Sequence, residues 1–214
     1  MCSRVYLDGS LGALLQAVFP ALEKAEGHPA RIGDVSPTDF AAVIHVPAGK
    51  NAPEWRSASW GFLPPGERDP RKQASFINAR AETVLERPLW REAARNPAQR
   101  CVIPVSGFYE WPGGVRHKVK PARPPREGFL IAGLLSWAMG PDGRFFTFTV
   151  ITTAPSAEFE PFHDRMPALL SPEAADRWMT EPNAEAAVAL LRPAPEGTLV
   201  AEENATKPVQ ERLL

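Results

Sequence analysis

The chain has 214 residues, of which 44% are hydrophobic and 23% are charged, and its formal net charge is −1. This composition is typical of a folded globular protein and excludes an intrinsically disordered chain. No apolar run approaches the roughly 18 residues of a membrane helix, and the start of the chain lacks a signal-peptide pattern. We therefore expect a cytoplasmic protein that does not contact a membrane.

Positive charge is concentrated in the middle of the chain. Residues 50–126 carry 15 Lys and Arg against 7 Asp and Glu, although the whole chain is nearly neutral. Such a segment favours contact with phosphates, but an ordinary solvated surface explains the charges equally well. The two cysteines, Cys2 and Cys101, lack the CxxC spacing of a zinc site, so we expect no metal.

Short elements are expected in the first half of the chain, because 24 prolines and 15 glycines are spread along the sequence. Apolar periodicity predicts a helix over Leu11–Ala25 and strands over Ala41–Val46 and near Arg56–Phe62. A second helical pattern covers Arg80–Arg95 and is interrupted at Pro88.

The middle of the chain holds long apolar and β-branched runs. These runs predict three further strands, over Cys101–Trp111, Phe129–Trp137 and Phe145–Thr153. Between the first two strands, the basic segment Pro112–Arg126 is predicted to be an exposed loop. Its charges favour either DNA contact or simple solvation, and solvation is the commoner role of a charged hairpin tip.

Helix signals are clearest near the C-terminus. Ser171 precedes Pro172 and is predicted to cap a helix that includes Ala174–Met179, and Asn183 is predicted to cap Ala184–Leu191. Together the elements predict an α+β fold. We expect one domain over residues 1–214, with a mainly antiparallel curved sheet or open barrel flanked by short helices.

Cys2 is the best candidate nucleophile, because removal of Met1 would leave an amine and a thiol on neighbouring carbons. A terminal amine has a reference pKa of about 8, so it is partly unprotonated at neutral pH and can condense with an aldehyde. The thiol can then add to the imine carbon and close a five-membered thiazolidine ring. Cysteine at position two is by itself weak evidence for this chemistry.

Three later segments concentrate reactive side chains. They are Asn78–Thr83, Gly107–Trp111 and His163–Pro167. Each has an ordinary structural explanation as well: Asn78 is a candidate helix cap, Glu110 a solvated carboxylate at a strand end, and His163 a loop residue without a function.

Together with Met1-Cys2-Ser3-Arg4, these segments resemble the SRAP family, the SOS-response-associated peptidases that shield abasic sites. Three further blocks carry the resemblance: Trp60–Pro64, Arg100–Pro104 and Thr152–Ala154. The order and number of the blocks make the match specific, and they cover most of the chain. The resemblance implies a single α+β domain whose basic groove holds single-stranded DNA, with the mature Cys2 at its floor.

The resemblance also implies a role for each reactive residue. Cys2 forms the crosslink to the sugar, and Asn78 holds the terminal amine or the sugar. Glu110 is the general acid and base during ring closure and reversal, and His163 assists proton transfer near the sugar oxygen. No cofactor is needed. The expected partner is single-stranded DNA with an abasic site, bound by a monomer that associates with the nucleoid on damaged DNA.

Arg4, Arg80 and Arg165 match family positions that contact phosphates. Thr152, Trp60 and Pro37 are further candidate DNA contacts. The guanidinium group is a planar donor fork that suits a phosphate, although a structural ion pair is the alternative for each Arg. The Thr152 hydroxyl is a candidate hydrogen-bond donor to DNA. Trp60 and Phe62 offer stacking surfaces, but such residues more often lie in a core.

Two residues depart from the family pattern. Ser3 stands where glycine is usual, and Asp34 stands where asparagine is usual. Because a carboxylate repels phosphate, Asp34 is expected to weaken DNA binding or to change how its loop is held.

Two other functions compete with the covalent one. In the first, the protein is a thiol peptidase that cleaves other proteins, with Cys2 as nucleophile, His163 as base, and Asn78 or Glu110 as the orienting partner. In the second, the protein binds nucleic acid without a covalent bond, and Cys2 is incidental.

Overall fold

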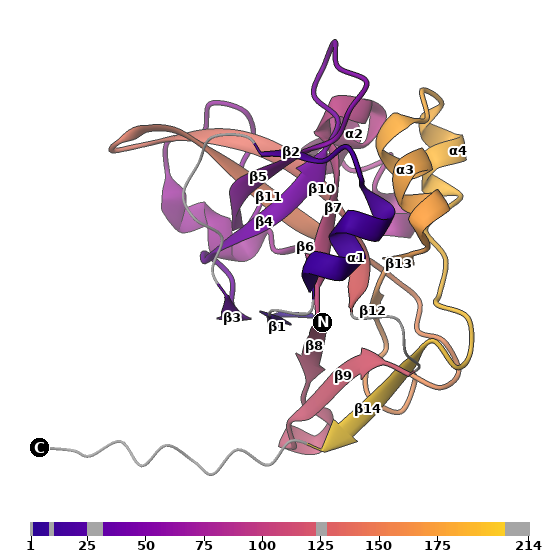
Figure 1. Ribbon diagram of the computed structural model, residues 1–214. Helices are drawn as coiled ribbons and strands as arrows, with labels where there is room; N and C mark the ends of the chain where they lie inside the picture. Colours follow the sequence, from indigo (N-terminus) through magenta and orange to yellow (C-terminus); the bar gives the residue numbers. More distant parts are fainter. Residues whose placement is uncertain (1, 9–10, 25–31, 123–127, 204–214) are drawn as a thin grey trace, which may run out of the picture.

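The computed structural model describes residues 2–8, 11–24, 32–122 and 128–203, and its centre is a barrel of five strands (Figure 1). These strands are β4 (Phe40–His45), β5 (Glu54–Trp60), β7 (Arg100–Val105), β10 (Phe129–Gly140) and β11 (Gly143–Thr153). They are hydrogen-bonded in the order β5-β4-β7-β10-β11, with antiparallel neighbours. A parallel pairing of β11 with β5, which places Thr147 opposite Ser59, closes the ring.

The closed ring confirms the α+β class and the mainly antiparallel, curved sheet, and it replaces the open barrel that the sequence left as an alternative. Gly133 on β10 shows how tightly the ring packs. A Cβ at this position would overlap the Ile103 side chain and the Thr149 carbonyl oxygen on the two flanking strands. The absence of a side chain there lets the three strands approach one another.

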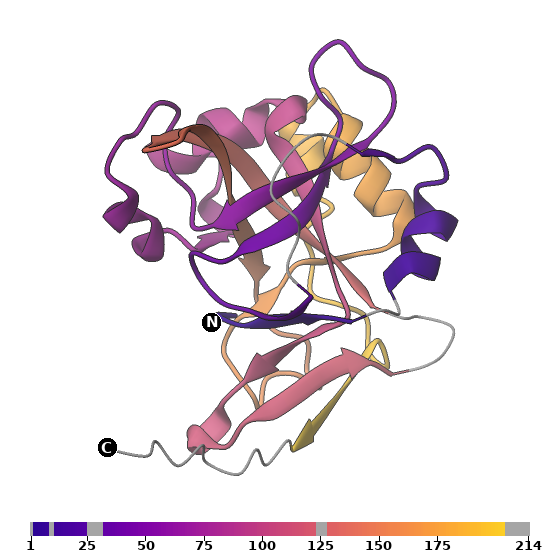
Figure 2. The ribbon, with the colours of Figure 1, turned by 60° about the vertical axis from the view of Figure 1, so that its left-hand side comes forward.

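A second, smaller sheet has five antiparallel strands. They are β1 (Val5–Leu7), β3 (Gly33–Val35), β8 (Gly107–Glu110), β9 (His117–Pro121) and β14 (Leu199–Glu203), in the order β14-β9-β8-β1-β3. In both ribbon views this sheet lies beneath the barrel, with β1 next to it (Figures 1 and 2). The smaller sheet therefore brings the start of the chain to the end of the barrel.

A single residue, Ser106, separates β7 in the barrel from β8 in the smaller sheet. Its hydroxyl donates to the Asp8 carboxylate (2.9 Å) and accepts from the Asp8 amide (2.9 Å), while its own amide donates to the Tyr6 carbonyl. The predicted strand Cys101–Trp111 is therefore two strands in different sheets. The prediction joined them because both are apolar and only one residue separates them.

Four short strands extend the barrel. They are β2 (Glu23–Lys24), β6 (Asn78–Arg80), β12 (Met166–Pro167) and β13 (Leu169–Leu170). The first pairs with β5, the second and third with β11, and the fourth with β10. The pairing of β6 with β11 is parallel and positions Asn78 beside the end of the barrel.

Short helices cover part of the barrel (Figure 1). The α-helices are α1 (Leu11–Val18), α2 (Pro88–Arg95), α3 (Pro172–Thr180) and α4 (Ala184–Val188), and 3-10 helices span Pro70–Ser75, Ala81–Thr83, Pro97–Gln99 and Pro112–Gly114. Ser171 and Asn183 cap α3 and α4 with their side chains, as predicted. Trp178 anchors α3, because its indole nitrogen donates to the Cys101 carbonyl (3.0 Å). None of the helices in the described ranges is long and apolar enough to cross a membrane.

Three predicted helices are shorter than expected, and the last of them, α4, ends at Val188 instead of Leu191. The first ends at Val18, two residues before Pro20, because the residue before a proline is disfavoured in the helical region. The second begins only at Pro88, since proline fits the first helical turn and cannot continue a helix that precedes it.

The described part of the predicted loop, residues 112–122, contains a 3-10 turn and the strand β9. Its lysines alternate with apolar or neutral residues, so that Val119 is buried while the Lys118 ammonium lies 3.9 Å from the centre of the Tyr6 ring. Residues 123–126 of the predicted loop, and Ala25 of the first predicted helix, lie outside the described residues.

Gly107 provides a test of how the smaller sheet packs. A Cβ at this position would overlap the Val119 carbonyl oxygen and the Tyr6 ring. We expect Gly107→Ala to lower the free energy of unfolding by about 1–3 kcal/mol, measured by denaturant titration. Gly12→Ala is the control, because Gly12 lies in α1 with no atom within 4 Å of the added Cβ. Equal stability of the two variants would contradict this description of the sheet.

Candidate functional site

Cys2 lies three residues before the start of β1 and is fully buried. The Asn78 side-chain amide donates to the Cys2 carbonyl oxygen at 2.8 Å. Asn78 is held in place because it pairs with Val150 of β11. Its side-chain oxygen is buried, and no described residue donates a hydrogen bond to it. The Asn78 side-chain nitrogen therefore fixes the Cys2 backbone, and the Asn78 side-chain oxygen is an acceptor beside it.

Glu110 is the last residue of β8 and is 3% exposed. Because side chains alternate along a strand, Glu110 and Phe108 point to one side of the sheet, and Tyr109 points to the other. Burial raises the pKa of the Glu110 carboxyl to about 7, the positive amino terminus opposes that shift, and Asp164 adds to it. The carboxyl group is therefore close to half-protonated at neutral pH and can both give and take a proton.

The Cys2 thiol is held in its protonated form. Burial raises the pKa of the thiol, and the neighbouring Glu110 carboxylate raises it further. A thiol of this kind is a poor nucleophile without a base, since the thiolate is the reactive species. The structure therefore pairs an unreactive thiol with a carboxyl group that is suited to accept its proton.

His163 lies in the loop before β12 and is half-buried. Its Nδ1 accepts from the Arg165 amide at 3.0 Å and lies 2.6 Å from an Asp164 carboxylate oxygen, two contacts that suit different protonation states. Burial lowers the pKa of the ring, and the positive amino terminus lowers it further. The neutral ring, in which Nδ1 accepts and Nε2 carries the proton, is therefore favoured at neutral pH.

The predicted catalytic residues come from separate parts of the sequence and meet near Cys2. Asn78 contacts Cys2 directly, Glu110 acts on the pKa of its thiol, and the charge of the amino terminus acts on Cys2, Glu110 and His163 alike. Such a set can bind and protonate a small electrophile at the start of the chain.

Two of the predicted phosphate ligands are accessible in part or in full. Arg80, at the end of β6, is exposed, and no described residue forms an ion pair with it. Arg4 is half-buried, and its guanidinium lies 5.8 Å from the centre of the Trp111 ring. Arg4 follows Cys2 by two residues, and Arg80 follows Asn78 by two residues.

Arg165 and Thr152 are placed differently from the expectation. The Arg165 guanidinium forms two hydrogen bonds to the Glu82 carboxylate, at 2.9 and 2.8 Å, which is the ion-pair alternative of the sequence analysis. Thr152 is fully buried, and its hydroxyl donates to the Ala79 carbonyl at 3.2 Å. A direct DNA contact by the Thr152 side chain is therefore wrong for this conformation.

The predicted stacking residues are in the core. Trp60 is fully buried, donates from its indole nitrogen to the Ile77 carbonyl (2.9 Å) and stacks on Phe148. Phe62 is 2% exposed and packs edge-on against Trp90. Neither ring is available to a base, so the stacking prediction is wrong for both.

Trp111 is the exposed aromatic residue that the sequence analysis did not assign. It is 36% exposed, follows Glu110 directly and lies under Arg4. The sequence contained a signal for this exposure. Trp111 directly follows Glu110, which ends β8 and faces inward, and the next side chain along a strand faces outward. Pro37, the remaining predicted contact, is half-buried in the turn between β3 and β4.

Asp34, the residue that departs from the family pattern, lies on β3 opposite Tyr6. Its carboxylate accepts from the Tyr109 hydroxyl at 3.2 Å, and Arg116 stacks on the same tyrosine at 4.4 Å. The carboxylate is therefore held within the smaller sheet. Ser3, the other departure, is half-buried between Cys2 and Arg4.

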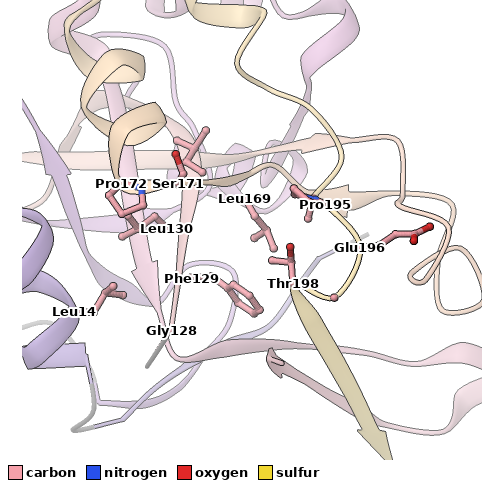
Figure 3. Close-up of a pocket in the computed structure, with 13 residues that line it drawn as sticks. Leu14, Gly128, Phe129, Leu130, Leu169, Ser171, Pro172, Pro195, Glu196 and Thr198 are labelled. Atoms are coloured by element: carbon pink, nitrogen blue, oxygen red, sulfur yellow. The ribbon is translucent and has the colours of Figure 1, made fainter. Parts of the chain in front are cut away.

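A cavity of about 430 Å³ lies elsewhere, between α1, the start of α3 and the segment that leads into β14 (Figure 3). It is lined mainly by apolar groups such as Leu14, Phe129 and Leu169, and none of the four predicted catalytic residues lines it. Within the described residues, no three His, Cys, Asp or Glu side chains form a metal-binding group. The candidate site is therefore the set of residues around Cys2.

Comparisons with known proteins agree with this fold. The family model for "SOS response associated peptidase (SRAP)" matches residues 1–212. The chain is 35% identical to abasic site processing protein YobE and 31% identical to abasic site processing protein YoqW, both of Bacillus subtilis, covering 86% of this chain and 84% and 83% of theirs. A solved Bordetella bronchiseptica structure, 26% identical, superposes with a TM-score of 0.77 over 96% of this chain and 100% of that one. The chain belongs to the SRAP family.

The raised pKa of Glu110 has a consequence for stability. Because the folded state holds the proton up to about pH 7, whereas an unperturbed carboxyl releases it near pH 4.5, folding becomes less favourable as pH rises through this interval. We expect Glu110→Gln to remove that loss. Measured by urea unfolding, the free energy of unfolding of the variant relative to that of wild type should rise by about 1–3 kcal/mol between pH 4.5 and 7.5. A difference between the two proteins that does not change with pH would contradict the assignment.

Proposed function

We propose that this protein processes abasic sites in single-stranded DNA by forming a covalent bond between Cys2 and the sugar aldehyde. The observation that carries the proposal is the buried Cys2, fixed through its carbonyl by Asn78 and lying beside a Glu110 carboxyl with a pKa of about 7. The names of the Bacillus subtilis relatives supply the substrate, since both are called abasic site processing proteins.

The first step is the removal of Met1. In the proposed maturation, the Cys2 thiol attacks the Met1 carbonyl carbon, the amide nitrogen takes a proton and leaves as a free amine, and water hydrolyses the resulting thioester. Glu110 is placed to accept the thiol proton, and Asn78 keeps the Cys2 backbone in position. The products are free methionine and an amino-terminal Cys2.

The second step joins Cys2 to the sugar. The amine of Cys2 adds to the aldehyde carbon, and protonated Glu110 supplies the proton that lets the oxygen leave as water. The ionised Glu110 then takes the thiol proton while the sulfur adds to the imine carbon and closes the thiazolidine. His163 is the proposed proton donor to a sugar oxygen. Overall, one water is lost and the same steps run in reverse.

The DNA strand is held by groups on both sides of Cys2. Arg80 and Arg4 are placed for phosphates, and Trp111 offers a partly exposed ring for a base. Pro37 remains a proposed contact. We further propose that a monomer acts in the cytoplasm, on the nucleoid when DNA is damaged.

The alternative functions are less well supported. A thiol peptidase that attacks other proteins normally lowers the pKa of its cysteine, whereas burial raises the pKa of Cys2. A purely non-covalent DNA binder has no use for a buried carboxyl group that shares its surroundings with Cys2. The geometry therefore favours the covalent, single-turnover reaction.

Adduct formation is the direct test of the proposal. Mature protein incubated with an abasic single-stranded oligonucleotide should give a product that survives denaturation, and Cys2→Ala should give none. Cys101→Ala is the matched control, because Cys101 is equally buried but lies on β7. Equal adduct from wild type and Cys2→Ala would refute the proposal. Turnover of an unrelated peptide by wild type would instead support the peptidase function.

Arg80→Ala tests the DNA contact separately from the chemistry. Each phosphate contact to a single strand contributes about 0.7 to the slope of log affinity against log salt, so the slope should decrease by about that amount. The measurement is a fluorescence-anisotropy titration at several salt concentrations. Arg177→Ala is the control, because Arg177 is exposed on α3, and Figure 1 shows that α3 lies away from β1. An unchanged slope in Arg80→Ala would remove this residue from the interface.

A further inference from the structure

Glu82 is a charged residue beside the site for which the proposed chemistry has no use. Its two carboxylate oxygens accept from the two terminal nitrogens of Arg165, at 2.9 and 2.8 Å. A phosphate group presents the same pair of oxygens to a guanidinium, with the same two parallel hydrogen bonds. Glu82 therefore occupies Arg165 in the way that a DNA phosphate would.

The exposure of the two side chains shows which of them covers the other. The Arg165 side chain is only 14% exposed, whereas the Glu82 side chain is 49% exposed. The rest of the guanidinium faces the protein, where one terminal nitrogen also donates to the Thr152 carbonyl at 2.7 Å. Glu82 thus contacts Arg165 on the solvent side. Removal of the Glu82 carboxylate would expose the guanidinium without disturbing its hydrogen bond to the Thr152 carbonyl.

The pair lies next to the groups of the candidate site. Arg80 precedes Glu82 by two residues and pairs with Thr152, whose carbonyl holds Arg165. Arg165 in turn donates its backbone amide to the ring of His163. Both cations are therefore held next to Thr152, and Glu82 is bound to one of them.

We propose that Glu82 is an internal competitor for DNA phosphate, so that binding of a single strand exchanges the Glu82 carboxylate for a phosphate on Arg165. The inference rests on the proposed function, because it assumes that single-stranded DNA is the ligand. Partly exposed ion pairs contribute little to stability, so the exchange is energetically accessible. Without DNA, Glu82 keeps Arg165 and the adjoining His163 segment in place. With DNA, it lowers the affinity, because its ion pair with Arg165 must be broken before a phosphate can bind there.

The test measures how affinity depends on salt, with the full chain and an oligonucleotide that carries a tetrahydrofuran analogue of the abasic site. This analogue has no aldehyde, so binding is observed without crosslinking. Glu82→Gln should bind about two- to fivefold more tightly than wild type, as expected when a partly exposed ion pair no longer has to be broken. Its salt slope should not be lower than that of wild type, because Arg165 now contacts phosphate in full.

Two further variants separate competition from a general change in charge. Glu86→Gln removes the same charge at an exposed position four residues away, where no described residue forms an ion pair with it. The double variant Glu82→Gln/Arg165→Ala is compared with Arg165→Ala alone. The proposal predicts no gain for Glu86→Gln and no gain in the Arg165→Ala background. A gain that persists without Arg165 means simple charge repulsion and overturns the proposal.

The remaining outcomes also have a definite meaning. Affinity and slope of Glu82→Gln equal to those of wild type overturn the competition while leaving the proposed function intact, provided that wild type binds and crosslinks DNA. Failure of wild type to bind any single strand overturns the proposed function itself. Thermal melting of each variant checks that the fold is retained, since Glu82→Gln keeps an oxygen that can accept from Arg165.

Discussion

The hydrogen bond from the Asn78 amide to the Cys2 carbonyl connects the start of the chain to the barrel, and the candidate site depends on it. Asn78 is held by a parallel pairing with β11, so the position of Cys2 is set by the rigid barrel, although Cys2 precedes the first strand. Terminal residues are usually poorly ordered unless they are tied down. A reactive terminus needs such a tie, because reaction requires the nucleophile and the proton-transfer groups to meet in one geometry.

Burial is the second constraint, and it acts on all three titratable groups in the site. It raises the pKa values of the Glu110 carboxyl and the Cys2 thiol and lowers that of the His163 ring, so it favours the uncharged form of each. An uncharged site suits an aldehyde, whose capture needs an unprotonated amine and a proton that can be passed back and forth. In the proposed function, the charges that attract DNA lie outside this region, on Arg80 and Arg4.

The sequence was informative where local pattern decides the structure. The caps Ser171 and Asn183 and the barrel strands follow from residue type and alternation. Tertiary packing decided the rest. The sheet change at Ser106 leaves no break in the apolar pattern, and the ring closure depends on a pairing between strands about 90 residues apart. Trp60 and Thr152 resemble ligand-binding residues in sequence but are core residues, because burial is a property of the assembled barrel.

The central claim is that a freed Cys2 reacts through both its amine and its thiol, and peptide mapping of the DNA adduct tests it most directly. After nuclease and protease digestion under conditions that preserve the adduct, tandem mass spectrometry should find the sugar remnant on the peptide that begins at Cys2. The mass should correspond to loss of one water, and the sulfur should resist alkylation. A remnant on a lysine, a modified peptide that still begins with Met1, or a Cys2 thiol that remains open to alkylation would contradict the account.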